Sequence, residues 1–484
     1  MSTGPLLGEL RPPSVRHRVA LARIATAAAG LIFLALAVTR RLNFDESLAL
    51  RAGWLDLAGE PSSPAFLMPW TLLAGAVGHL FADPGAVFVT LRIFAAGGVV
   101  AAFAFALRAA GLGAGGSAIA AWLALSNAAF ATHGLEFRYD AAVLILLLLG
   151  YEAIVHERSP LLVGALAGTL ALHHLKGAFF ASALLLVATA MSANRRSTTI
   201  TAAGGAIAAG LIWCGLLLPL GLLGRYAESL GTFFHLARES ARAPLIETLG
   251  PALLRDLPWW LLVLTTLAST VFGGRPSERE PCELAALSLA CAGVAFWLLH
   301  PHAWAYLAAL PSALLAIQSA RLLGSGAVSW RVPTVALAVG LLLQQLSMAA
   351  PPLDHLSRAF SAPMEPEAAL LRGLRAELLP DDAILDPSGM AYFGRPCTRE
   401  WYLDSLYAER LQRGEWMADL GSGLVPTCTL ALNTYRMLAL PPAALLQLRS
   451  NFVLMPSGIL VPPERAADLS ALPALARREI ESFW

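Results

Sequence analysis

Apolar stretches long enough to cross a membrane recur from near residue 19 to near residue 349. Crossing a hydrocarbon core about 30 Å thick takes roughly 17 to 25 apolar residues, and backbone groups inside lipid must be hydrogen-bonded within their own segment. Hydrophobic residues make up 57% of the chain and charged residues only 14%, which is too apolar for one soluble domain. The sequence therefore predicts an α-helical polytopic membrane protein.

The apolar stretches divide into about eleven spans, and counts of twelve or thirteen remain open because several stretches are short. The ambiguous stretch 66–82 is assigned to a first outer loop of about 40–85. The spans are placed near 19–39, 86–108, 114–133, 140–156, 160–174, 177–191, 199–222, 258–273, 283–300, 303–321 and 332–349.

Arginines in the short loops set the orientation of these spans. Cytoplasmic loops are enriched in Lys and Arg, so the arginine-bearing loops and the basic N-terminal tail 1–18 are predicted to be cytoplasmic. The multi-span domain 19–349 then ends with residues 350–484 outside. Counting 66–82 as a span would reverse every later loop. The loop arginines are Arg108, Arg158, Arg195, Arg196, Arg275, Arg279, Arg321 and Arg331.

The region 350–484 has a different pattern, with more charge, frequent prolines and short strand-like runs between helical segments. Strand-like runs lie near 383–385, 427–432 and 452–460, and helical segments near 399–413 and 441–448. This pattern predicts a small extracytoplasmic α/β domain. Cys397 and Cys428 could form a disulfide in such an oxidising compartment, and the sequence leaves that question open.

Polar residues gather at the predicted outer ends of the helices, where charges need a reason to approach lipid. Such a cluster favours a polar cavity at the outer membrane boundary. Cationic groups there could hold a phosphate, while a carboxylate took a proton from an attacking hydroxyl. This chemistry fits glycosyl transfer from a lipid-linked sugar phosphate. The residues are Asp45, Glu46, Glu136, Arg138, Asp140, His173, His174, Lys176, Arg225, Tyr226, His235, Arg238, Glu239, Arg242, His300 and His302.

Four short motifs, taken in order, resemble those of the GT-C membrane glycosyltransferases. This family includes the protein O-mannosyltransferases and the lipid A aminoarabinose transferases. The motifs are Asn43-Phe44-Asp45-Glu46 after the first span, Phe137-Arg138-Tyr139-Asp140, Leu175-Lys176-Gly177, and His302-Ala303-Trp304-Ala305-Tyr306 followed by Pro311. One departure is Glu60-Pro61-Ser62-Ser63-Pro64, where many relatives have a Lys-Pro or His-Pro pair.

The resemblance implies a donor that is a polyprenyl-phosphate sugar and an acceptor that is a lipid, glycan or protein, without nucleic acid. The high content of Ala, Leu, Arg and Gly with few lysines suggests a GC-rich bacterial genome, and so an inner membrane. It implies no certain cofactor and leaves a divalent metal ion open. Asp45 would be the catalytic base and Glu46 its support, while Lys176 and Arg138 would bind the donor phosphate. The residues expected to bind the rest of the substrates are Asp140, His302, Tyr306 and His235.

Two other interpretations remain open. Asp45 and Glu46 could be solvated helix-end charges, and Arg138 with Asp140 a structural ion pair. A multi-pass transporter or lipid flippase could also line its substrate path with such charges. Transporters generally place these groups near the midplane and often contain internal repeats, neither of which is evident in this sequence.

Overall fold

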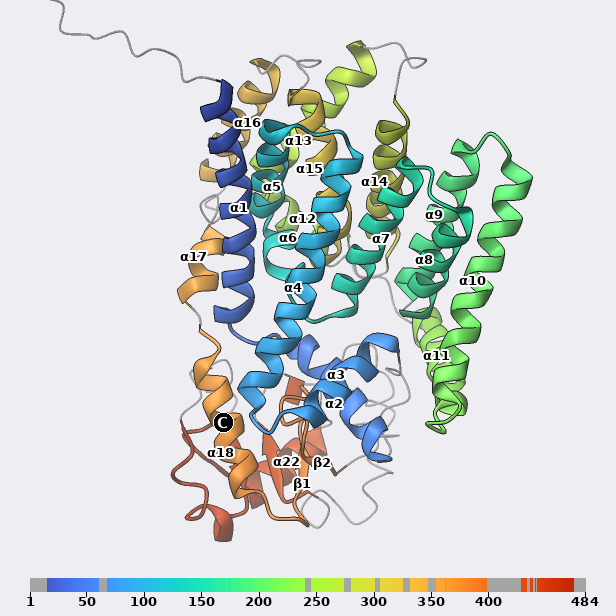
Figure 1. Ribbon diagram of the computed structural model, residues 1–484. Helices are drawn as coiled ribbons and strands as arrows, with labels where there is room; N and C mark the ends of the chain where they lie inside the picture. The colour runs from blue at the N-terminus through green and yellow to red at the C-terminus, as the bar shows by residue number, and fades with distance from the viewer. Residues whose placement is uncertain are drawn as a thin grey trace, which may run out of the picture.

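The computed structural model of the chain is a bundle of long helices with a second, mixed layer at one end (Figure 1). Helices α2 and α3 and the described strands lie in that end layer. The structure describes residues 15–60, 68–173, 175–239, 245–273, 280–300, 305–324, 331–346, 354–361, 363–397, 428–432, 436–437, 440 and 442–473.

The bundle contains five described helices that are long and apolar enough to cross a membrane, namely α1, α4, α10, α14 and the stretch Tyr306–Gly324. The polytopic helical character is therefore confirmed, while the count of eleven spans stays a prediction. The helices of the bundle are α1 (Val15–Thr39), α4 (Pro84–Ala109), α5 (Ala114–Ser126), α6 (Ala128–His133), α7 (Tyr139–Val155), α8 (Pro160–His173), α9 (Leu175–Met191), α10 (Arg195–Leu217), α11 (Leu223–Glu239), α12 (Leu245–Arg255), α13 (Leu257–Gly273), α14 (Pro281–Leu299), η3 (Ala305–Ala308), α15 (Ala309–Gly324) and α16 (Arg331–Leu346).

Two stretches of the bundle differ from the sequence prediction. The span predicted over 114–133 is broken at Asn127, whose side chain accepts a hydrogen bond from the Phe130 N–H and so begins a new helix, α6. The segment 223–257, which the sequence prediction leaves as an outer loop between the spans 199–222 and 258–273, contains the two helices α11 and α12. Mean hydropathy registers neither a helix cap made by one side chain nor amphipathic helices such as α11 and α12.

Small residues allow the helices to approach closely where lipid gives no hydrophobic driving force. A Cβ atom on Gly164 of α8 would lie 1.9 Å from the carbonyl oxygen of Ala202 on α10. One on Gly205 of α10 would lie 2.1 Å from the carbonyl oxygen of Leu161. These glycines fix the contact between α8 and α10, and α8 leads directly to the turn that carries Lys176.

The end layer begins with the helical hairpin α2 (Phe44–Ala58) and α3 (Pro69–Leu80). Twelve residues of α-helix extend about 18 Å, so α3 is too short to cross a hydrocarbon core by itself. The two helices touch through facing glycines. A Cβ atom on Gly53 would lie 1.8 Å from the Thr71 carbonyl oxygen, and one on Gly75 would lie 2.1 Å from the Gly53 carbonyl carbon.

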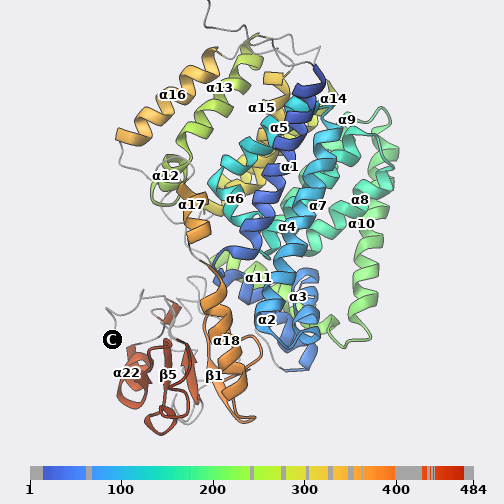
Figure 2. The ribbon, with the colours of Figure 1, turned by 60° about the vertical axis from the view of Figure 1, so that its left-hand side comes forward.

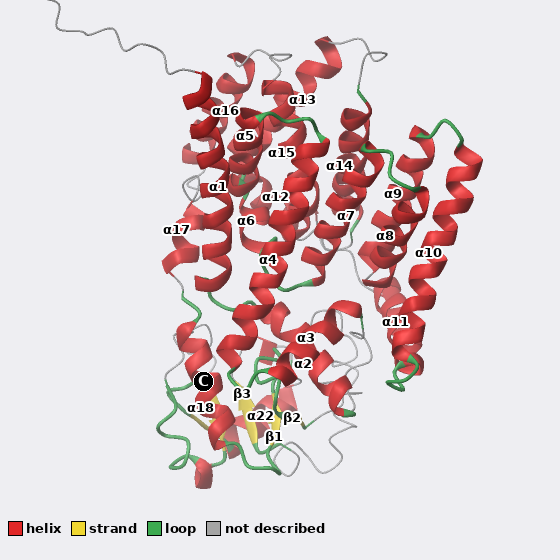
Figure 3. Ribbon diagram, viewed as in Figure 1, coloured by secondary structure: helices red, strands yellow, loops and turns green. Residues whose placement is uncertain are grey.

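The C-terminal region contributes a five-stranded sheet with the order β2-β1-β3-β5-β4. The pairs of β1 with β2 and β3 are parallel, whereas β5 pairs antiparallel with β3 and β4. Strands occur in this layer of the molecule (Figure 3). The elements are α17 (Asp354–Ser361), α18 (Glu365–Glu377), β1 (Ala383–Leu385), β2 (Arg395–Pro396), β3 (Leu430–Leu432), α22 (Pro442–Asn451), β4 (Val453–Leu454), β5 (Ile459–Val461) and η6 (Pro463–Arg465).

These elements agree with the strand-like runs and the helical segment near 441–448, whereas the predicted helical segment 399–413 lies outside the described residues. A disulfide joins Cys397 to Cys428, with an S–S distance of 2.13 Å. The assignment of 350–484 as a separate extracytoplasmic domain stays a prediction.

The C-terminal region is attached at two places, to the segment before α2 and to the middle of α2. The Glu367 carboxylate of α18 accepts from the Leu42 N–H at 2.8 Å and from Arg41 Nε at 3.2 Å. Arg51 of α2 is fully buried and donates to Asp386 Oδ2 at 3.1 Å and to the Ala391 carbonyl at 3.0 Å. The backbone of this region is therefore held against the segment that carries Asp45, and α18 runs along this junction (Figure 2).

Candidate active site

Three helices present a charged side chain from their second residue to one common cluster: Asp45 on α2, Asp140 on α7 and Lys176 on α9. Lys176 Nζ lies 2.9 Å from Asp140 Oδ1. Arg138, at the N-cap of α7, connects the two acids, with its Nη2 3.0 Å from Asp45 Oδ2 and 3.4 Å from Asp140 Oδ2. The structure thus brings together the acidic motif, the Arg-x-Asp motif and the lysine turn, which are far apart in the sequence.

Asp45 is positioned by the N-terminus of α2. The Asn43 side chain caps this helix and accepts from the Asp45 N–H at 3.0 Å, while the Glu46 carboxylate accepts from the Asn43 N–H at 3.0 Å. This reciprocal arrangement satisfies backbone donors that the first helical turn leaves open. The Asp45 side chain remains 28% exposed.

Glu46 points the other way and is buried. Its carboxylate accepts from Arg92 Nε at 2.8 Å, from Arg92 Nη2, and from the Phe137 N–H at 2.8 Å. Arg92 belongs to α4, is fully buried and also donates to the Arg41 carbonyl at 2.8 Å. The sequence prediction missed Arg92, although a lone arginine within an apolar stretch signals a buried partner.

Tyr306 of η3 lies under both cations of the cluster. The Arg138 guanidinium is 4.1 Å from the centroid of its ring, and Lys176 Nζ is 4.7 Å from it. Lys176 Nζ also donates to the Tyr306 hydroxyl at 3.5 Å. Cation–π attraction strengthens when the charge is shielded from water, so Tyr306 fixes the directions of Arg138 and Lys176.

Glu136 lies beside the cluster and is neutralised by its own partners. Arg40 Nη1 is 2.8 Å from its carboxylate, His133 Nδ1 is 2.9 Å away and Arg138 Nη1 is 3.5 Å away. Burial by itself would raise the pKa of this carboxyl, but His133, Arg40 and Arg138 hold the pKa well below its usual range. Glu136 is therefore an ionised structural acid that anchors one side of Arg138.

The C-terminal region supplies a further cation that the sequence analysis did not single out. Arg436 Nη2 donates to Asp45 Oδ1 at 2.7 Å, and Arg436 is 6% exposed. Asp45 consequently contacts two guanidinium groups, one on each oxygen, from two separate parts of the chain. No pattern around position 436 announces this contact, because it depends on how the sheet packs against α2.

The other candidate residues are less informative. His302 and the sequence departure at 61–64 lie outside the described residues, and of His235 only the backbone in α11 is described. His173 is a packed histidine, with Nδ1 2.7 Å from the Thr169 carbonyl, and Arg225 pairs with Asp56 at 3.0 Å. Among the described residues, no group of three or more His, Cys, Asp or Glu side chains could hold a metal ion.

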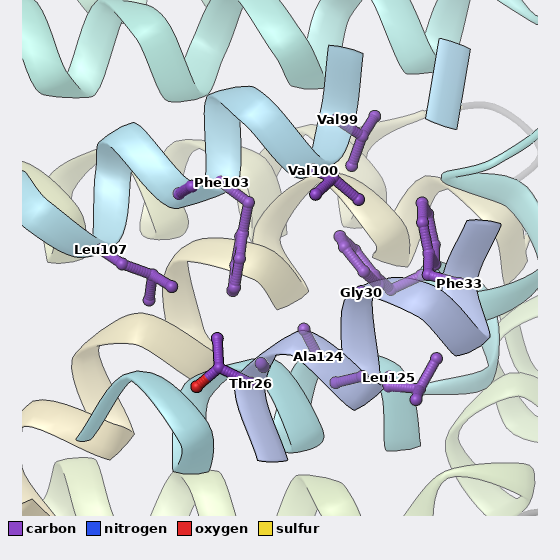
Figure 4. Close-up of a pocket in the computed structure, with 13 residues that line it drawn as sticks. Thr26, Gly30, Phe33, Val99, Val100, Phe103, Leu107, Ala124 and Leu125 are labelled. Atoms are coloured by element: carbon purple, nitrogen blue, oxygen red, sulfur yellow. The ribbon is translucent and has the colours of Figure 1, made fainter. Parts of the chain in front are cut away.

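An apolar cavity of about 90 Å³ lies between α1, α4, α5 and α6 (Figure 4). Its lining includes Phe33, Phe103 and Phe130, and Phe33 stacks on Phe130 with ring centroids 5.3 Å apart. None of the residues that line this cavity is charged. The cavity is therefore separate in chemistry from the cluster around Asp45.

Comparison with known structures identifies the fold. ArnT from Cupriavidus metallidurans in the apo state aligns with a TM-score of 0.61 at 13% identity, over 96% of this chain and 100% of that chain. The structure of the same enzyme bound to undecaprenyl phosphate gives a TM-score of 0.59 at 12% identity and the same coverage. No family model matches the sequence, and no curated protein does. At this identity the likeness shows the fold, and this chain has the GT-C fold that the sequence motifs predict.

Proposed function

We propose that the chain is a membrane glycosyltransferase that moves a sugar from a polyprenyl-phosphate donor to an extracytoplasmic lipid, glycan or protein. The observation that carries this proposal is the contact chain Lys176–Asp140–Arg138–Asp45, which joins cations to a partly exposed carboxylate. The fold supports it, since one structure that shares this fold is a complex with undecaprenyl phosphate.

The proposed reaction is a direct displacement at the anomeric carbon. Asp45 accepts the proton of the acceptor hydroxyl, and the acceptor oxygen forms a bond to the anomeric carbon with inversion. The bond between that carbon and the phosphate oxygen breaks, and polyprenyl phosphate leaves with the electron pair. Lys176 and Arg138 stabilise the charge on the departing phosphate through charge-assisted hydrogen bonds.

The ends of three helices also favour the binding of an anion at the cluster. The N-termini of α2, α7 and α9 meet at the cluster, and each carries the partial positive charge of its helix dipole. Arg138 Nε is buried and has no hydrogen-bond partner among the described residues, so it offers a donor to a substrate oxygen. A phosphate would find several donors there.

The remaining assignments follow from contacts and from the family resemblance. Asp140 holds Lys176 in place, Tyr306 supports both cations, and Glu46 positions α2 through Arg92 rather than touching substrate. His302 and His235 are assigned to substrate binding on resemblance and outer-loop position. The proposed topology has eleven spans in a bacterial inner membrane, with the N-terminus cytoplasmic and the region 350–484 outside.

Purified protein in lipid nanodiscs, assayed with a panel of polyprenyl-phosphate sugars and acceptors, tests the proposal. We expect transfer by the wild type and a loss of about 10³-fold in Asp45→Asn, since a general base contributes roughly 10² to 10⁴. Asp354→Asn, on α17, is the matched control and should transfer normally. Equal rates in wild type and Asp45→Asn would exclude the assigned base, and lipid movement without sugar transfer would support a flippase instead.

A further inference from the structure

In the arrangement that the structure shows, each oxygen of Asp45 accepts from a guanidinium group, so two cations compete with the acceptor hydroxyl for the carboxylate that we assign as the base. Arg138 Nη2 is 3.0 Å from Oδ2 and Arg436 Nη2 is 2.7 Å from Oδ1. A base needs an oxygen within hydrogen-bond reach of the acceptor hydroxyl. Release of one arginine would leave a carboxylate oxygen fully available to that hydroxyl.

Arg138 is held by several contacts besides the one with Asp45. Its guanidinium stacks over the Tyr306 ring at 4.1 Å and contacts Asp140 at 3.4 Å and Glu136 at 3.5 Å. Moving it would break these contacts together. It also occupies the N-cap of α7, so its backbone is fixed by the helix that follows.

Arg436 reaches Asp45 from the opposite side, out of the C-terminal region. That region is attached to α2 through Arg51 and to the segment before α2 through Glu367. The long arginine side chain can turn about its own bonds without moving the sheet. Arg436 is thus the arginine whose release from Asp45 would leave the contacts of Arg138 with Tyr306, Asp140 and Glu136 intact.

We propose that Arg436 is a donor-binding residue that moves from Asp45 to the donor phosphate, and that this exchange frees the base. The inference rests on the proposed function and names the C-terminal region as part of the active site. A guanidinium matches the geometry of phosphate oxygens as well as it matches a carboxylate, so the anionic donor competes directly with Asp45 for Arg436. Donor binding then leaves the base more open to the acceptor hydroxyl, which favours a reaction in which the donor binds first.

The test compares Arg436→Ala and Arg436→Lys with the control Arg395→Ala, all in the full-length protein in nanodiscs. Arg395 is exposed on β2 of the same sheet. We expect the donor KM and the dissociation constant of polyprenyl phosphate to rise roughly 10- to 100-fold in Arg436→Ala, which is typical for losing a charged hydrogen bond. Added guanidinium ion should restore part of the loss in Arg436→Ala, a rescue that a structural role would not give. The Arg395 variant should match wild type.

Thermal melting checks that each variant folds. If Arg436→Ala does not fold, Arg436→Lys carries the test, because it keeps the charge and loses the two-pronged contact, and its donor KM should still rise several-fold. An unchanged donor KM and unchanged polyprenyl phosphate binding in a folded variant would overturn the role of Arg436. That result leaves the proposed function standing as long as wild type transfers sugar and Asp45→Asn does not. A wild type that transfers no sugar refutes the proposed function instead.

Discussion

Asp45 faces the junction between the bundle and the C-terminal region, whereas Glu46, the next residue, faces inward against α4. The side chain of Asp45 is 28% exposed and that of Glu46 is 1% exposed. Both pair with arginine, but Glu46 meets one arginine that belongs to the membrane bundle, and Asp45 meets two from separate parts of the chain. Neighbouring acids in one helical turn therefore lie in two different environments.

The difference separates a structural acid from a reactive one. Each Glu46 oxygen is engaged by the Arg92 guanidinium and by a backbone N–H, and no water reaches the pair. A substrate could replace one of these contacts only by leaving a buried charge without its partner, which is strongly unfavourable. The Asp45 side chain is partly exposed, and we propose that one of its two arginines, Arg436, binds the donor phosphate instead. Both residues are carboxylates, so we attribute the reactivity of Asp45 to a partner that another anion can replace.

The largest expected effect comes from Glu46→Ala. This change leaves the Arg92 guanidinium buried without its carboxylate, which should reduce the free energy of unfolding by about 3–5 kcal/mol. Thermal melting of the detergent-solubilised protein measures this loss. Asp45→Ala should melt within a few degrees of wild type while losing transfer, and equal destabilisation by the two changes would contradict the contrast between the acids.

A second large effect is expected from Gly177→Ala, beside Lys176. A Cβ atom at this position would lie 1.8 Å from the carbonyl oxygen of Leu170, and a backbone atom yields less easily than a side chain. The start of α9 must shift, so we expect about 3 kcal/mol of destabilisation and weaker transfer. Gly204→Ala on α10 is the control, since a Cβ there meets nothing within 4 Å. The prediction fails if the two variants melt alike.

A smaller effect is expected for Lys176→Gln, which tests donor binding at the cluster around Asp45 directly. The variant keeps a hydrogen-bonding side chain but loses the charge that we assign to the donor phosphate. We expect the donor KM to rise about 30-fold, or about 2 kcal/mol, with little change in the acceptor KM. Kinetics with each substrate varied in turn measure this. An increase confined to the acceptor KM would mean that Lys176 binds the acceptor and not the donor phosphate.

Much of the membrane bundle could be predicted from the sequence because lipid imposes a simple rule on composition. The spans predicted from the apolar runs lie close to α1, α4 and α14, and the order of the motifs predicted the fold. The break at Asn127 was missed, since it depends on one side chain capping a helix within an apolar run. Hydropathy averages over windows and does not register such a cap.

The sequence predicted the residues that the helices contribute to the candidate site, but not the one from the C-terminal region. Asp45, Arg138, Asp140 and Lys176 stand in recognisable order along the chain, and the helices bring them together. Arg436 follows from the packing of a sheet whose strands are two or three residues long, and no periodic pattern fixes that packing. Tertiary contacts between a membrane bundle and an irregular outer region are where sequence reasoning is weakest.

The smallest effect is expected at Arg372 on α18, which resembles Arg92 in chemistry and differs from it in burial. Its side chain is 40% exposed, pairs with Glu365 and lies 3.4 Å from Asp83. Water and salt screen such pairs, so Arg372→Ala should change the free energy of unfolding by less than about 1 kcal/mol and lose even that at high salt. Melting curves at two salt concentrations test this. A loss as large as that of Glu46→Ala would mean that charge pairing, and not burial, decides which arginines hold the structure together.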